Sequence, residues 1–262
     1  MTTIIKLMYL GGKTIFPSIT IIVLTYLYSI THIKEWIPFF YLRDLSHIDI
    51  GHGKVYNGLR HGDEIKVSKT TTVGLVIKDY VVLAADKRAT AGLYISHKKV
   101  EKIHKVTDYM AMTISGLVAD AQVLVDEAKA IAKQYELLTG VKPSVKSIAT
   151  YLSNILSSYL RLVPFIVQLL VGGYDTRPRL YYVDLFGTLS EEKYMATGSG
   201  SPTAFGVLEK EYREDMSLDE AKELAKSAVK AALERDAWSG EGIDIVVIGK
   251  DLYKKETYLF KG

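Results

Sequence analysis

The sequence contains no cysteine. Without cysteine the chain can form no disulfide, and it offers no thiolate to bind a metal or to act as a nucleophile. Such a composition is typical of a cytoplasmic protein, and we expect this location. The six histidines include no His-Glu-x-x-His pair, so we expect neither a metal site nor a cofactor.

A strong excess of charge of one sign is also missing. The chain has 33 Lys and Arg against 30 Asp and Glu, a net charge of +3, and the two signs alternate along the sequence. A nucleic-acid surface needs clustered basic residues, so we expect no nucleic-acid partner. The chain lacks a Gly-x-Ser-x-Gly elbow and a dinucleotide fingerprint, and its glycine-rich segment 198–202 lacks the lysine of a phosphate-binding loop.

The first fifty residues differ in composition from the rest. Ile15 to Ile30 form a nearly uncharged apolar run, and an aromatic patch spans Trp36 to Tyr41. The run is shorter than the roughly 20 residues that a membrane-spanning helix needs, and it lacks the small-residue cleavage pattern of a secretory signal. We expect residues 1–69 to be a leader that is removed or in part never translated. Membrane attachment through residues 15–41 is the alternative.

From Thr70 onward the sequence has the texture of a globular domain. Alternating apolar residues and short β-branched runs predict strands at 71–77, 80–85, 99–105, 109–115, 165–172, 179–185, 193–197, 243–248 and 257–260. A period of 3.6 residues predicts helices at 117–135, 144–159, 201–212 and 217–235. Blocks of strands that alternate with blocks of helices favour two stacked sheets covered by helix layers, rather than a doubly wound fold.

A run of three threonines, Thr70 to Thr72, begins the first predicted strand. A threonine hydroxyl is a weak nucleophile until a base takes its proton, and the nearest possible base is the threonine's own α-amino group, with a pKa near ~8. Cleavage between Lys69 and Thr70 would create nucleophile and base together. Taken alone, the three threonines equally suit a plain strand, because β-branched residues favour strands.

Several segments between Thr70 and about Ile248 form a distinctive series in order and spacing. They are 70–74 (TTTVG), 84–88 (AADKR), Lys102, 115–121 (SGLVADA), 169–173 (LLVGG), 197–202 (TGSGSP) and 235–240 (RDAWSG). In this series the chain resembles archaeal-type proteasome β subunits. The resemblance implies an α+β fold, a four-layer αββα sandwich of the N-terminal-nucleophile hydrolase type, with residues 70–262 as the catalytic domain. It also implies a heptameric β ring, outer rings of α subunits, a regulatory ATPase ring and unfolded proteins as substrates.

The same resemblance implies roles for individual residues. Thr70 corresponds to the nucleophile, and Asp86 and Lys102 to the buried pair beside it. The backbone N–H of Gly116 corresponds to the oxyanion donor, and the groups that surround the terminal amine correspond to Ser199, Asp236 and Ser239. The positions of the first substrate pocket are Ala89, Val100, Ile114 and Val118, with Thr90 placed to pair with the substrate backbone. Since these side chains are small or apolar, we expect cleavage after large hydrophobic residues.

The cleavage point departs from the family pattern. Lys69 stands where a glycine is usual, and glycine permits the tight turn that presents its carbonyl to the threonine hydroxyl. One alternative function is therefore a ring-completing β subunit that keeps its leader or depends on another subunit to remove it. Another is an N-terminal-nucleophile hydrolase that acts on a small amide, but segments 198–201 and 236–240 fit the proteasome pattern better.

Overall fold

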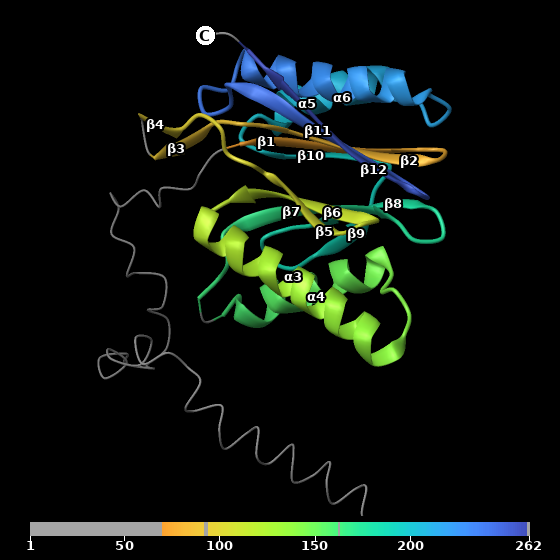
Figure 1. Ribbon diagram of the computed structural model, residues 1–262. Helices are drawn as coiled ribbons and strands as arrows, with labels where there is room; N and C mark the ends of the chain where they lie inside the picture. The colour runs from red at the N-terminus through yellow and green to blue at the C-terminus, as the bar shows by residue number, and fades with distance from the viewer. Residues whose placement is uncertain (1–69, 92–93, 162, 261–262) are drawn as a thin grey trace, which may run out of the picture. The chain divides into compact units, whose positions relative to one another are not determined.

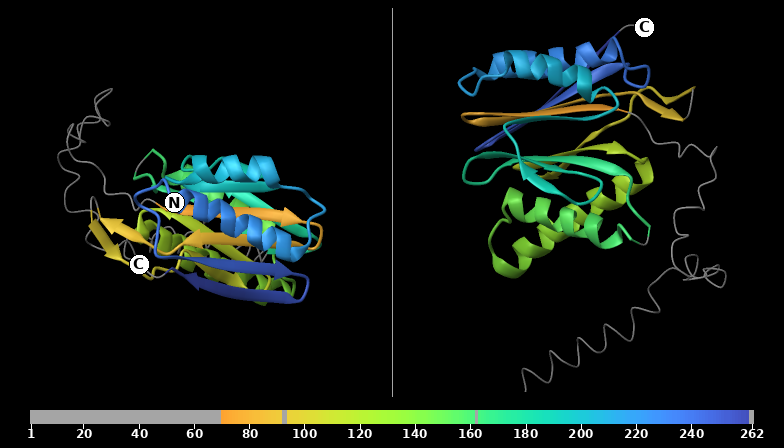
Figure 2. Two further views of the ribbon diagram at one scale, coloured as in Figure 1. Left: turned by 90° about the horizontal axis from the view of Figure 1, so that it is seen from above. Right: turned by 180° about the vertical axis from the view of Figure 1, so that it is seen from behind.

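The computed structural model describes residues 70–91, 94–161 and 163–260 of the chain. In this part, two five-stranded antiparallel sheets stack face to face, and a pair of helices covers the outer side of each sheet (Figure 1). Figure 2 shows the same four layers from behind. The predicted αββα sandwich is confirmed, and the leader with its apolar run lies outside the described residues.

The first sheet carries the N-terminal strand of the domain. Its strand order is β10-β1-β2-β11-β12. The strands are β1 Thr71–Ile77, β2 Tyr80–Asp86, β10 Tyr194–Gly198, β11 Gly242–Gly249 and β12 Leu252–Leu259, and the covering helices are α5 Ser201–Glu211 and α6 Leu218–Leu233. Ser217 caps α6 through a capping box with Glu220.

The second sheet has the order β5-β6-β7-β8-β9. Its strands are β5 Ile103–Thr107, β6 Met110–Gly116, β7 Val167–Tyr174, β8 Pro178–Val183 and β9 Leu189–Glu191, and it is covered by α3 Val118–Thr139 and α4 Val145–Tyr159. A separate hairpin pairs β3 Ala89–Ala91 with β4 Tyr94–His97. At one end of α3, Gly140 adopts a left-handed conformation with φ 71°.

Three short strands, β3, β4 and β9, do not follow from the sequence pattern. Each has three or four residues, too few for a two-residue alternation to stand out. The predicted strand at 99–105 starts later, at Ile103, because the backbone N–H of Val100 is bonded to Lys87 O outside the sheet ladder. The last strand, β12, begins at Leu252, earlier than the predicted strand at 257–260. The sequence pattern missed its first part because much of the strand is polar and exposed.

Apolar side chains fill the space between the two sheets. Val81 and Leu83 from β2 pack against Leu170 and Leu180 of the second sheet. The sheets approach closely at Gly172, where an added Cβ would lie 2.8 Å from Val81 Cγ1. Two further apolar clusters lie between each sheet and its helices, so the interior has three apolar layers.

No helix among the described residues is both long enough and apolar enough to span a bilayer.

Two glycines offer a matched test of backbone conformation. A Cβ added at Gly140 or at Gly206 would meet no atom within 4 Å, but only Gly140 has a positive φ. Gly140→Ala should therefore destabilise the fold by about 1–2 kcal/mol, and Gly206→Ala, inside helix α5, should stabilise it by up to about 1 kcal/mol. Thermal unfolding midpoints, compared in the same assembly state, should move in opposite directions. Equal shifts would contradict the described conformation of Gly140.

Candidate active site

The carboxylate of Asp86, at the end of strand β2, is the centre of a buried cluster. Its Oδ1 atom accepts three hydrogen bonds: from Thr70 Oγ1 at 2.9 Å, from the backbone N–H of Thr71 at 2.9 Å and from Lys102 Nζ at 2.7 Å. Asp86 is 1% exposed and Thr70 2% exposed. The structure thus brings together the predicted nucleophile and the predicted buried pair.

The other oxygen of Asp86 fixes the surrounding loops. Oδ2 accepts hydrogen bonds from the backbone N–H groups of Gly240, at 3.0 Å, and Arg88, at 3.1 Å. The Arg88 side chain in turn donates to Ala237 O and to Glu241 Oε1. One carboxylate therefore joins the first threonine to the loop that follows helix α6.

Strand register explains why these residues meet. In the β1–β2 hairpin, Thr72 pairs with Ala85, so the start of β1 lies beside the end of β2. Lys102 lies just before β5, in the second sheet, and reaches Asp86 across the interior. One hairpin therefore brings the predicted nucleophile Thr70 next to Asp86, but the Lys102 ammonium reaches them only when the two sheets stack.

Lys102 is held in a dry environment, with 6% of its side chain exposed. Burial lowers the pKa of its ammonium group, and the charge and hydrogen bond of Asp86 oppose that shift only in part. The ammonium and the Thr70 hydroxyl donate to the same oxygen atom. The positive charge of Lys102 therefore lies next to the position where a Thr70 alkoxide would form.

A second chain of hydrogen bonds runs along the other side of Thr70. Asp236 Oδ2 accepts from Ser199 Oγ at 2.7 Å and from Ser239 Oγ at 2.6 Å. Ser199 Oγ also lies 3.4 Å from Thr70 O, and Ser239 Oγ lies 2.8 Å from Thr71 Oγ1. The three predicted amine-site residues are thus connected to one another and to the first two threonines.

Two glycines next to Thr70 leave no room for a side chain. Gly198, with φ 90°, would place a Cβ 2.0 Å from Thr70 O. Gly116, with φ 139°, would place a Cβ 2.0 Å from Ile166 O. A close backbone approach is thus needed at both positions.

Thr70 lines a cavity of about 150 Å³ between β5, β6 and the first turns of α3. Gly116 lines this cavity, as do three of the predicted pocket residues, Val100, Ile114 and Val118. Ala89 and Thr90, in the β3–β4 hairpin, are not among its lining residues, and their role in substrate binding stays a prediction.

Four further lining residues do not follow from the sequence reasoning. They are Glu101, His104, Ala121 and Gln122. Helical spacing could have found two of them, because Ala121 and Gln122 lie three and four residues after Val118. Strand alternation could have found His104, two positions after Lys102.

Buried hydroxyl groups join the two sheets behind the site. Thr72 Oγ1 lies 2.7 Å from Thr197 Oγ1 and accepts from Thr113 Oγ1 at 3.0 Å, while Ser115 Oγ donates to Thr197 Oγ1 at 3.0 Å. These hydroxyls give three strands, β1, β6 and β10, a fixed set of polar partners inside an apolar interior. In the sequence each is an ordinary strand residue.

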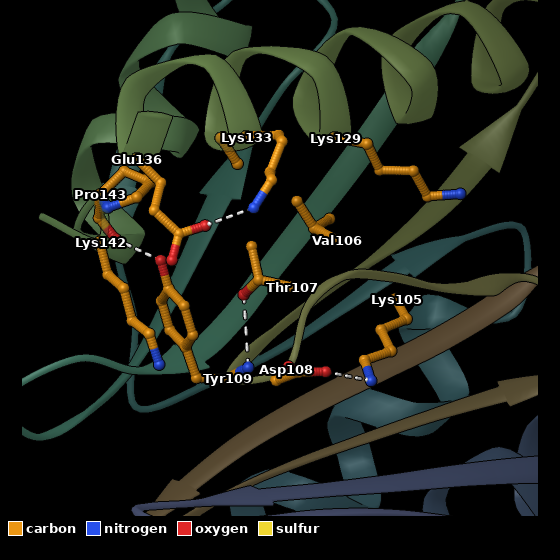
Figure 3. Close-up of a pocket in the computed structure, with 11 residues that line it drawn as sticks. Lys105, Val106, Thr107, Asp108, Tyr109, Lys129, Lys133, Glu136, Lys142 and Pro143 are labelled. Carbon is orange, nitrogen blue, oxygen red and sulfur yellow. Dashed lines mark hydrogen bonds and ion pairs between the residues drawn. The ribbon is translucent and has the colours of Figure 1, made fainter. Parts of the chain in front are cut away.

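A larger hollow, of about 330 Å³, lies at the β5–β6 turn and along α3 (Figure 3). Its charged groups are largely paired with one another: Lys105 with Asp108 at 2.5 Å, and Lys133 with Glu136 at 3.2 Å. It contains none of the predicted catalytic residues, so the smaller cavity at Thr70 is the better candidate site. Within the described ranges, no three acidic or histidine side chains cluster in a way that could hold a metal ion.

Comparisons with known proteins agree with this geometry. The family described as Proteasome subunit matches residues 67–248. A protein named Proteasome subunit beta 2 from Staphylothermus marinus is 66% identical over 196 residues, which cover 74% of this chain and 94% of the relative. Its namesake from Desulfurococcus amylolyticus is 63% identical over 196 residues, covering 74% and 95%.

A more distant relative, named Proteasome subunit beta, comes from Methanocaldococcus vulcanius. It is 49% identical over 185 residues, which cover 70% of this chain and 82% of the relative. A match over most of the described domain, with relatives covered almost end to end, shows the family. The chain therefore belongs to the proteasome family, and it is a β-type subunit that assembles with other subunits in the proteasome core.

Proposed function

We propose that this subunit is a threonine-type endopeptidase whose nucleophile is the Thr70 hydroxyl. One observation carries the proposal: Thr70 Oγ1 and Lys102 Nζ donate to the same oxygen of Asp86, at the edge of a cavity that Gly116 also lines. Cleavage at Lys69–Thr70 frees the α-amino group that serves as the base. Lys69 itself lies outside the described residues.

The proposed reaction begins when Thr70 Oγ attacks the carbonyl carbon of the scissile peptide bond and its proton passes to the free α-amino group. Lys102 stabilises the negative charge that develops on Oγ, and the backbone N–H of Gly116 that on the carbonyl oxygen. The amine then returns the proton to the leaving nitrogen, which leaves an ester on Thr70. Water, activated by the same amine, hydrolyses the ester and restores the hydroxyl.

Asp236, Ser199 and Ser239 act on the amine rather than on the substrate. Their hydrogen bonds reach Thr70 O and Thr71 Oγ1, directly beside the position of the new terminus. A carboxylate near an ammonium group favours its charged form, so Asp236 raises the basicity of the amine. The two serine hydroxyls hold the Asp236 carboxylate in place.

The proposal includes the assembly in which the enzyme works. Seven β subunits form a ring that stacks on a second ring, α rings cap the pair, and a regulatory ATPase ring supplies unfolded proteins in the cytoplasm. Support comes from the names of the relatives and from exposed apolar side chains in and just after α3, which suit contact with neighbouring subunits. Leu137, Leu138 and Val141 are 72%, 78% and 61% exposed.

A ring-completing subunit that keeps its leader is the second candidate, because Lys69 replaces the usual glycine. The two candidates differ in where the mature chain begins. We expect the mass of the subunit in the assembled native particle to correspond to residues 70–262, with Thr70 as the first residue. A subunit mass that includes residues before Thr70 would favour the second candidate instead.

Replacement of the nucleophile should separate chemistry from assembly. Thr70→Ala should lower peptidase activity by more than about 10³-fold, because no hydroxyl remains to attack the carbonyl. Thr70→Ser, which keeps the hydroxyl, is the matched control and should retain measurable activity. Hydrolysis of a fluorogenic peptide and size-exclusion chromatography report the two properties. Full activity in Thr70→Ala particles would rule out Thr70 as the nucleophile.

The buried ammonium should set the alkaline limit of activity. Burial lowers the pKa of Lys102, so its ammonium loses a proton at a lower pH than an ordinary lysine does. As pH rises through this lowered pKa, the ammonium no longer stabilises the alkoxide. In Lys102→Arg, the charge persists to higher pH. We expect lower kcat in this variant, with the alkaline limb of the kcat/KM profile moved upward. If the alkaline limb of the Lys102→Arg profile does not move, a group other than Lys102 causes it.

A further inference from the structure

A second buried ion pair begins one residue after Asp86. The ammonium group of Lys87 donates a hydrogen bond to Asp244 Oδ2 at 2.6 Å. The exposed fractions of the two side chains are 10% and 1%. Asp244 belongs to β11 and is the sheet partner of Ala85 on β2. Among the described residues, no other group bonds the Lys87 ammonium. Loss of the Asp244 charge would therefore leave a buried cation without a partner.

The carboxylate of Asp244 is also bonded to strand β12. Thr257 Oγ1 donates to Asp244 Oδ1 at 2.6 Å, and Lys255 Nζ lies 3.8 Å from Asp244 Oδ2. Lys255 Nζ in turn donates to Glu101 Oε1. Glu101 directly precedes Lys102, in the segment that leads into the second sheet. Through Lys255, Asp244 is thus linked to the residue beside Lys102.

Backbone hydrogen bonds connect Lys87 to the same segment. The backbone N–H of Lys87 donates to Gly240 O at 3.1 Å, and the backbone N–H of Val100 donates to Lys87 O at 3.0 Å. Gly240 also donates its own N–H to Asp86 Oδ2. Val100 lies two residues before Lys102. A shift of Lys87 would therefore move the main chain next to both members of the Asp86–Lys102 pair.

Stability alone does not require an ion pair between β2 and β11. Taking two charges out of water is costly, and well-packed apolar side chains of similar volume often give a fold of equal or greater stability. A charge-assisted hydrogen bond differs from apolar packing because it sets both the distance and the direction between two groups. The Lys87–Asp244 pair is therefore suited to placing the main chain.

We propose that Asp244 is a positioning residue of the endopeptidase proposed above. Through Lys87 and Lys255 it fixes the main chain beside Asp86 and beside Lys102, and so sets where the Lys102 ammonium meets the nucleophile. Asp244 acts only through these neighbours and does not touch the reacting atoms. The inference rests on the proposed function and adds a residue that the reaction depends on from outside the cavity.

The variant Asp244→Asn removes the charge and keeps the shape of the side chain. A displacement of about 1 Å at a catalytic group can lower a rate by about 10²-fold. We expect kcat per assembled particle to fall by about 10-fold or more. KM for a fluorogenic peptide should stay within about 2-fold of the wild-type value, since the apolar wall of the cavity is unchanged.

Two conservative comparisons test the route through the neighbours. Lys87→Met should lower kcat as Asp244→Asn does, and Lys87→Arg, which keeps the charge and can still reach the carboxylate, should stay within about 3-fold of wild type. Lys255→Met breaks the link to Glu101 and should lower kcat by about 3-fold. Its matched control is Lys254→Met, on the same strand but paired with Glu256 instead, which should have no effect.

A double-mutant cycle separates positioning from a general loss of stability. If Asp244 acts through the Asp86–Lys102 pair, Asp244→Asn should lower kcat by a smaller factor in Lys102→Arg particles than in wild-type particles. A purely structural role would give the same factor in both backgrounds. Size-exclusion chromatography and thermal unfolding midpoints show whether each particle is assembled and folded.

Several outcomes would overturn the proposal. Wild-type kcat in Asp244→Asn particles does so, and so does an equal factor in the two backgrounds of the cycle. If Asp244→Asn and Lys87→Met particles do not assemble, Lys255→Met, whose side chain is 34% exposed, decides the question: a kcat equal to that of Lys254→Met overturns the proposal. Absence of hydrolysis by wild-type particles whose chains begin at Thr70 would instead overturn the endopeptidase itself.

Discussion

The candidate site depends on one buried carboxylate that accepts five hydrogen bonds. Asp86 receives donors from Thr70, Thr71, Arg88, Lys102 and Gly240. A carboxylate buried to this extent is tolerated only when its lone pairs are satisfied, and loss of one partner from a buried ion pair costs about 3–5 kcal/mol. The same contacts that stabilise the charge therefore fix the positions of the hydroxyl and the ammonium group.

The stacked sheets supply the rigid frame for this cluster. Asp86 lies at the end of β2, while Lys102 comes from the segment that leads into the opposite sheet. The apolar layer between the two sheets, together with the hydroxyl bonds that cross it, holds the sheets at a fixed separation. Interiors of this density resist small displacements, so the distance between ammonium and hydroxyl is set by the fold as a whole.

Much of the fold could be predicted from the sequence, because its long elements carry strong patterns. Helices such as α4 and α6 have clear apolar stripes, and Ser144 and Ser217 mark their first residues. The short strands β3, β4 and β9 could not be predicted, since three or four residues hold no period. Pairing in these strands depends on tertiary contacts that no local window contains.

The residues of the candidate site, like the elements of the fold, could be predicted only in part. The resemblance to proteasome β subunits was enough to name Thr70, Asp86 and Lys102, and the structure brings these three together. The polar members of the cavity, His104 and Gln122, were missed because each is unremarkable within its own segment. Only the packing of α3 over the sheet places them in one cavity, and that packing is a property of the three-dimensional fold.

The hydrogen bond from Gly240 to Asp86 joins residues 154 positions apart. A ribosome adds residues one at a time, so the Thr70 end of the domain exists long before residue 240 leaves the exit tunnel. Until then Asp86 lacks one of its donors, and the loop that carries Asp236 and Ser239 is not yet available. A growing chain therefore lacks the complete cluster of hydrogen bonds around Asp86. The order of synthesis delays completion of the candidate site until the whole domain has been made.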